Sequence, residues 1–168
     1  RPREISPIDL QSHTGEAFTV ANLTGQWTFA FFGFTNCPDI CPTTMAVLGQ
    51  ARRALGDGAA FQGLLVSVDP ERDTAELLAD YATAFAPDFI GVRGSVAEIG
   101  RFAEQVNVAF AKVPQLAADG SPDPSGYLVD HSANIVIINP RGHYHGFIKY
   151  PQQADTITAA FQSLAANF

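Results

Sequence analysis

The sequence is poor in basic residues and has no long apolar run. Only 10 Lys and Arg stand against 17 Asp and Glu, for a formal net charge of −7, and the longest basic run is Arg52 and Arg53. A nucleic-acid-binding surface needs concentrated positive charge, so nucleic acid is excluded as an expected partner. The longest apolar run, around residues 27–34, is far shorter than the roughly 20 residues of a membrane-spanning helix, and its length suits a buried strand.

Cysteine and methionine are also scarce. The chain has two Cys and one Met among 168 residues, too few cysteines for a disulfide scaffold. Apolar residues, in contrast, make up 46% of the sequence and include 13 Phe. At this length they can form one packed core, so a single compact domain is predicted.

The first half of the chain predicts a βαβ unit. Residues 1–14, which contain Pro2 and Pro7, are expected to be an extended lead-in to a domain spanning 15–168, with an edge hairpin at 15–23. The predicted core elements are a buried strand at 26–34, a helix from Pro42 to Leu55 and a second buried strand at 61–68. A helix that connects two strands through short loops forms a crossover, so the two strands are predicted to be parallel.

The second half adds helices, a loop and a hairpin. Asp73 with Glu76, and Ser95 with Glu98, have the spacing of capping boxes. The remaining predicted elements are helices at 74–85 and 96–104, a strand at 89–92, a loop at 113–126, hairpin strands at 132–138 and 143–148, and a final helix carrying Ile157, Phe161, Leu164 and Phe168 on one face. The fold class is therefore α/β, a thioredoxin-like fold with a central mixed β-sheet flanked by helices and an N-terminal extension or hairpin.

Two cysteines follow the predicted central strand, at the sheet edge where sites usually form. Cys37 and Cys41 each precede a proline, which disfavours helical backbone, so Cys41 is predicted as the N-cap and Pro42 as the first helical residue. The helix dipole and free amides stabilise a thiolate there, which predicts a reactive pair. Three intervening residues allow both sulfurs to bind one metal ion or to form a disulfide, and a permanent structural disulfide over so small a loop would add little stability.

Four histidines are candidates for a third ligand. His13 is interpreted as a solvated loop residue. His143 and His145 share a strand face but follow the hairpin turn, roughly 20 Å from its start at strand rise. If the first hairpin strand is antiparallel to the central strand, it begins beside the cysteines, so His131 is the geometric choice.

Acidic residues near these positions have two interpretations. Asp69 could supply a carboxylate to the site or to a partner, but a turn in which Arg72 pairs with a neighbouring acid and Asp73 caps the next helix is favoured. Asp130 could orient His131, or its side chain could point away. Met45 has the helical spacing of a core residue.

Three segments of the chain resemble the Sco (SenC) family of copper chaperones. They are FFGFTNCPDICPTTM at 31–45, LLVSVDPERDT at 64–74 and YLVDHSANIVIINPRG at 127–142. The resemblance implies a thioredoxin fold with copper held by Cys37, Cys41 and His131. It implies a domain anchored on the periplasmic side of the bacterial inner membrane by a preceding segment, or in the mitochondrial intermembrane space. It also implies a role at the dinuclear copper (CuA) site of cytochrome c oxidase subunit II, with another periplasmic copper chaperone or a thioredoxin-like reductase as further partners.

The donor set itself suits copper. Two thiolates and one imidazole satisfy Cu(I), can accept Cu(II) and leave a position open for transfer, whereas structural zinc requires four ligands. The alternative function is a thiol-disulfide oxidoreductase that uses Cys37 and Cys41 as its redox pair without obligatory copper transfer. A thiol peroxidase is disfavoured, because the position three residues before each cysteine holds Phe34 or Pro38 instead of threonine.

Overall fold

The computed structural model describes residues 2–35, 40–116, 118–131 and 133–168. In the described ranges an eight-stranded sheet has the order β1-β10-β9-β4-β5-β6-β2-β3, and β7 pairs with β8 in a separate ribbon. The strands are β1 (Arg3–Glu4), β2 (Leu10–Ser12), β3 (Ala17–Phe18), β4 (Trp27–Gly33), β5 (Phe61–Ser67), β6 (Ile90–Arg93), β7 (Phe110–Leu116), β8 (Pro122–His131), β9 (Ile135–Ile138) and β10 (His143–Ile148). The helices are η1 (Val20–Leu23), α1 (Ile40–Leu55), α2 (Ala75–Phe85), α3 (Val96–Gln105) and α4 (Ala154–Ala166).

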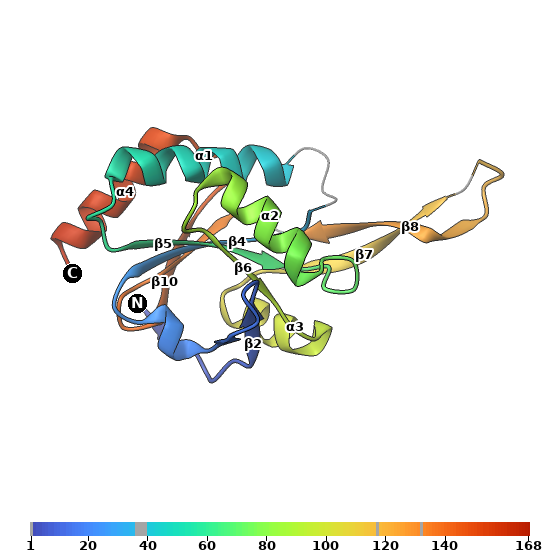
Figure 1. Cartoon of the computed structure of the whole chain (residues 1–168), viewed down its shortest axis with the longest axis horizontal. Helices are drawn as coiled ribbons and strands as arrows, with labels where there is room; N and C mark the ends of the chain where they lie inside the picture. Colours follow the sequence, from blue (N-terminus) through green and yellow to red (C-terminus); the bar gives the residue numbers. More distant parts are fainter. Residues whose placement is uncertain (1, 36–39, 117, 132) are drawn as a thin grey trace.

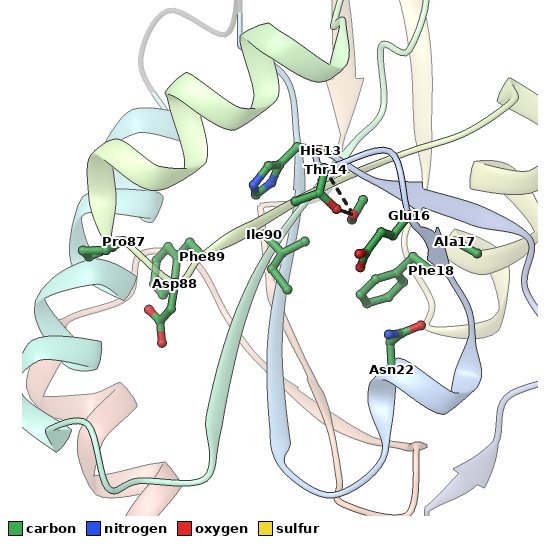
Figure 2. A pocket seen from close by; sticks show the side chains of 11 residues that line it. His13, Thr14, Glu16, Ala17, Phe18, Asn22, Pro87, Asp88, Phe89 and Ile90 are labelled. Carbon is green, nitrogen blue, oxygen red and sulfur yellow. Dashed lines mark hydrogen bonds between the residues drawn. The ribbon is translucent and has the colours of Figure 1, made fainter.

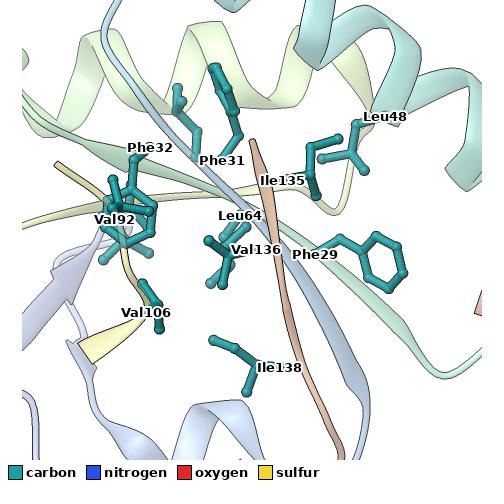
Figure 3. Packing of buried hydrophobic residues seen from close by; sticks show 14 of the residues in the cluster. Phe29, Phe31, Phe32, Leu48, Leu64, Val92, Val106, Ile135, Val136 and Ile138 are labelled. Carbon is teal, nitrogen blue, oxygen red and sulfur yellow. The ribbon is translucent and has the colours of Figure 1, made fainter. Parts of the chain in front are cut away.

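Strand β4 is the centre of the core. All seven of its residues are buried, as the continuous apolar run predicts for a strand covered on both faces. Its aromatic side chains alternate between the two faces: Phe29 contacts Phe161 of α4, with ring centroids 6.4 Å apart, and Phe32 contacts Phe102 of α3 at 5.3 Å. Figure 3 shows Phe29, Phe31 and Phe32 of β4 among the buried residues, together with Leu48 of α1.

The helices cover both faces of the sheet. Helices α1, α2 and α4 lie on one side, where α1 packs against both α2 and α4, and α3 lies on the opposite side (Figure 1). Met45 of α1 is fully buried, which confirms its interpretation as a core residue. None of the helices in the described parts of the chain is long and apolar enough to span a membrane.

The strand directions bring the ends of several strands to one edge of the sheet. Strands β4, β5 and β6 are parallel, as predicted for the βαβ unit, and β9 is antiparallel to β4 with Phe31 opposite Ile135. The ends of β4, β5 and β6, at Gly33, Ser67 and Arg93, therefore lie along the same edge as the start of β9. We call this the carboxyl edge.

The N-terminal residues join the main sheet. Within the segment expected as a lead-in, β1 pairs with β10 and β2 pairs with both β3 and β6. The hairpin expected at 15–23 instead spans β2 and β3, and residues 20–23 form the short helix η1. Leu10 and Phe18 are both buried and face each other across this hairpin, whose turn contains Gly15 at φ +89.

The prediction of a loop at 113–126 is wrong. This region forms most of the antiparallel ribbon β7–β8, which projects from the body of the molecule (Figure 1). Its prolines suggested a loop, but each strand of a two-stranded ribbon is an edge strand and tolerates residues that lack an N–H donor. The turn is stabilised by Asp119 Oδ1, which accepts hydrogen bonds from Ser121 N and Oγ, and by Gly120 at φ +83.

One of the two predicted helix caps is confirmed. Ser95 Oγ accepts a hydrogen bond from Glu98 N and caps α3. The cap of α2 is Thr74, whose Oγ1 accepts a bond from Leu77 N, and not Asp73. Both residue types are good caps, so their order in the sequence could not decide between them.

Candidate functional site at the carboxyl edge

Cys41 lies within the first turn of α1. The helix begins at Ile40, so the prediction that Cys41 is the N-cap and Pro42 the first helical residue is wrong. The first four amides of a helix have no partner inside it, so a proline among these positions costs no intrahelical hydrogen bond. Cys41 is helical despite the separate steric bias against helical backbone in the residue before a proline.

The sulfur of Cys41 packs against the end of β4. The side chain is 0% exposed, and a Cβ added at Gly33 would lie 2.9 Å from Cys41 Sγ. The thiol predicted as reactive is therefore buried at the end of the strand. Glycine suits position 33 because a side chain there would compete with the sulfur for this space.

The other two predicted ligands are Cys37 and His131. Cys37 lies outside the described residues. His131 is the last residue of β8, and its backbone pairs with that of Phe110. Four residues later, Ile135 begins β9 opposite Phe31 of β4, so the antiparallel pairing assumed in selecting His131 is confirmed. The ligand set itself remains a prediction.

The remaining histidines lie elsewhere. His13 is not a free loop residue: its N–H donates to Gly91 O at 2.7 Å and its Nδ1 accepts from Gly91 N at 3.0 Å, which extends the pairing of β2 with β6. His143 and His145 lie on β10, past the turn that follows β9 and away from the carboxyl edge. A β-bulge between Tyr144 and Gly146 interrupts the alternation that would place the two histidines on one face.

His145 has an apolar environment. Its ring contacts Trp27 edge-on, with centroids 5.1 Å apart, and its Nδ1 lies 3.3 Å from Asn139 Nδ2. Burial lowers the pKa of the His145 imidazole below its ordinary value. Across the described residues, no group of three or more His, Cys, Asp or Glu side chains is arranged to hold a metal ion.

Asp69 has the structural role that was favoured. It is 1% exposed and forms an ion pair with Arg72, with Asp69 Oδ2 and Arg72 Nε 2.5 Å apart. Asp130 lies on β8 opposite Ala111. The orienting role considered for Asp130 stays a prediction.

The sequence reasoning missed the role of Asp73. Because Thr74 caps α2, the Asp73 carboxylate is available for other partners: Oδ1 accepts from Thr35 Oγ1 at 2.5 Å, and Oδ2 accepts from Thr35 N at 3.2 Å and from Ser67 Oγ at 2.8 Å. Asp73 and Ser67 are both buried. The only sequence signal was that Asp73 and Thr74 compete for one cap.

A separate pocket of about 240 Å³ lies between the β2–β3 hairpin and the start of β6. Figure 2 shows His13, Glu16 and Asp88 among its lining residues. Asp88 precedes β6 and His13 pairs with Gly91 near its amino end, the opposite end from the carboxyl edge. The pocket is therefore not part of the thiol site.

The fold and the thiol at the start of α1 define a class: a thioredoxin-like α/β domain with a cysteine at the junction of its central strand and first helix. The SCO1/SenC family model matches residues 1–166. The chain belongs to the SCO1/SenC family, which confirms the resemblance seen in the sequence.

Individual relatives agree with this assignment. A protein of Stutzerimonas stutzeri whose name describes copper binding is 33% identical over 99% of this chain and 79% of its own length. The mitochondrial SCO2 homolog of Bos taurus is 33% identical over 96% of this chain. The chain spans only 59% of that mitochondrial relative.

Solved structures show the same fold. The copper-bound ScoI of Arabidopsis thaliana is 32% identical, with a TM-score of 0.86 and coverage of 97% of this chain and 98% of that chain. A more distant protein, BsSco, is described as a member of the Sco family of cytochrome c oxidase assembly proteins and shares the fold at 23% identity and a TM-score of 0.72.

Proposed function

We propose that this protein is a copper-binding metallochaperone that holds one copper ion through Cys37, Cys41 and His131. It delivers the copper to the CuA site of cytochrome c oxidase subunit II, or prepares the cysteines of that site. The domain acts on the periplasmic side of a bacterial inner membrane, tethered by a preceding segment. This setting rests on the family, whose members include mitochondrial proteins and a lipoprotein of Bacillus anthracis.

The observation that carries this proposal is the convergence of two distant segments on the carboxyl edge. Cys41 lies in the first turn of α1 with its sulfur against Gly33, the last residue of β4. The chain that follows His131 enters β9 beside the same end of β4, with Ile135 opposite Phe31.

The chemistry of the donor set also supports copper. Thiolates are soft ligands that select Cu(I), and an imidazole is a good ligand for either oxidation state. Three protein ligands leave a coordination position at which a recipient ligand can attack, so copper can pass between proteins without being released to water. Copper-bound ScoI from Arabidopsis thaliana has the same fold.

A copper titration tests the proposal. The reduced protein is titrated with Cu(I) under a competing chelator, and with Cu(II) while sulfur-to-copper charge-transfer absorption is recorded. We expect one copper per chain and loss of tight binding in Cys37→Ser, Cys41→Ser and His131→Ala. His143→Ala is the matched control, because His143 lies on β10 past the far end of β9 and should leave binding unchanged.

Equal copper affinity in His131→Ala and in the unmodified protein would remove His131 from the ligand set. Absence of stoichiometric copper in the unmodified protein would reject the metallochaperone function.

The alternative function is reduction of a disulfide in a partner protein. Its supporting observation is that Cys41 lies in the first turn of α1, where the helix dipole favours a thiolate. In this reaction the two thiols become a disulfide and pass two electrons and two protons to the target disulfide, which becomes a dithiol. Turnover with a disulfide substrate and a defined dithiol potential, without stoichiometric copper, would favour this function over the first.

A further inference from the structure

Asp73 is a buried carboxylate whose partners lie at the carboxyl edge. It is 1% exposed, and its two oxygens accept three hydrogen bonds, two from Thr35 and one from Ser67. Burial of a carboxylate is costly unless donors replace its water, so these bonds hold the side chain and its donors in one arrangement. Thr35 follows β4 by two residues and Ser67 ends β5.

The backbone of Asp73 is also held in place. Its N–H donates to Asp69 O at 2.9 Å, and its carbonyl accepts from Arg93 Nε at 3.2 Å. Arg93 ends β6 and also donates through Nη2 to Pro70 O at 3.1 Å. Asp73 is therefore connected to the ends of three neighbouring parallel strands, and it cannot move without disturbing all of them.

The contact with Thr35 fixes main chain as well as side chain. Asp73 accepts from both the N–H and the hydroxyl of Thr35, which is 38 residues away in sequence. Thr35 directly precedes the segment 36–39, which contains Cys37, and Cys41 follows that segment with its sulfur against Gly33. The described residues on both sides of Cys37 are thus anchored to the sheet.

We propose that Asp73 is a positioning residue for the copper site: through Thr35 it fixes the point from which the chain enters the Cys37 segment, and so sets the distance between the two sulfurs. This inference rests on the proposed function of the thiol pair. Capping of α2 does not account for the carboxylate, because Thr74 performs it.

The test compares paired variants. Thr35→Val removes the hydroxyl donor and keeps the side-chain shape, whereas Thr35→Ser keeps the hydroxyl and should behave as the unmodified protein. Asp73→Asn replaces one accepting oxygen with an NH₂ group, which faces the donors of Thr35 and Ser67 and cannot accept from them. This variant should therefore have the larger effect. Thr74→Ala is the control: it removes the α2 cap next to Asp73 and lowers stability without touching Thr35.

Three measurements are made on each variant: copper affinity by chelator competition, the energy of the sulfur-to-copper absorption, and the dithiol–disulfide potential of the metal-free protein. We expect Thr35→Val and Asp73→Asn to weaken copper binding by about 10- to 100-fold, the range for residues that orient metal ligands. Both should also shift the absorption band and the potential. Thr74→Ala should change only the unfolding temperature.

The proposal is overturned if Thr35→Val binds copper with unchanged affinity and absorption and keeps the same dithiol potential. Should Asp73→Asn fail to fold, Thr35→Val and Thr35→Ser still decide the question, since the first removes only the hydroxyl bond to Asp73 and the second keeps it. If the unmodified protein binds no copper, the proposed function fails; the potential of the metal-free protein then decides separately whether Asp73 positions the thiols, and an unchanged potential in Thr35→Val rejects that role.

Discussion

The Cys41 sulfur occupies the space at the end of β4 that a side chain at position 33 would need. A methyl group at position 33 would lie 2.9 Å from Cys41 Sγ and 2.9 Å from Phe31 Cε1, closer than van der Waals contact. In the chain as it stands, the absence of a side chain at 33 lets the sulfur rest directly on the strand. A single hydrogen atom in place of a methyl group therefore decides where this thiol lies.

We expect Gly33→Ala to lower the free energy of unfolding by about 1–3 kcal/mol, the usual cost of overpacking a core, and to displace the Cys41 sulfur. Urea unfolding and the reaction rate of the thiols in the reduced protein measure the two effects. Gly100→Ala is the matched control, because no atom lies within 4 Å of the added Cβ in α3 and alanine should stabilise that helix by about 0.5–1 kcal/mol. Equal stability of the two variants would show that the space at Gly33 is not restrictive.

The imidazole of His145 couples stability to pH. Because burial lowers its pKa in the folded state, the unfolded chain binds more protons between the two pKa values. The stabilising contribution of the neutral ring is complete above the unfolded pKa of about 6.5 and is lost as the pH falls through 6.5 toward the lower, folded value.

We therefore expect the unfolding temperature to fall between about pH 7.5 and pH 5, and to fall less in His145→Gln, whose side chain does not titrate. Thermal unfolding of both proteins across this range measures the difference. Identical pH dependence in the two proteins would show that His145 is not coupled to folding.

At the scale of elements, α3 illustrates how a local sequence signal leads to packing. Ser95 caps the helix, and the apolar face that follows carries Ile99 and Phe102, both fully buried on the side of the sheet opposite α1. The ring of Phe102 contacts Phe32 of β4. The cap thus fixes the start of a helix that closes one face of the core.

Replacing Ser95 with alanine should destabilise the protein by about 0.5–2 kcal/mol, because Glu98 N loses its acceptor. Chemical denaturation monitored by circular dichroism measures this change. Glu98→Gln is the companion variant: it breaks the partly exposed pair with Arg101, at 2.9 Å, and should change stability by no more than about 1 kcal/mol. A smaller loss in Ser95→Ala than in Glu98→Gln would contradict this ranking.

Elements with strong periodicity or clear turns were predictable from the sequence. The β9–β10 hairpin follows from its turn, where Asn139 Oδ1 accepts from Arg141 N and His143 N and Gly142 has φ +78. The β7–β8 ribbon was not predictable in this way, because its prolines and polar residues have the composition of a loop and its pairing depends on two strands that find each other.

For the whole molecule, the order of elements was sufficient to predict the α/β class and the thioredoxin-like arrangement. The pairing of β4 with β9 was also predictable, since a hairpin following a βαβ unit has few places in such a sheet. The start of α1, the burial of Cys41 and the network around Asp73 were not. Each depends on contacts between the carboxyl edge and residues distant in sequence, which neither propensity nor periodicity describes.

The position of β9 has a further consequence for how the chain is made. Strand β4 is complete by residue 33, but the neighbour on one of its sides is not synthesised until Ile135–Ile138. Until then, this strand, which is fully buried in the folded protein, has a row of unpaired amides and carbonyls, the kind of surface that templates aggregation. Nascent or prematurely terminated chains ending before residue 135 are thus the species most in need of protection.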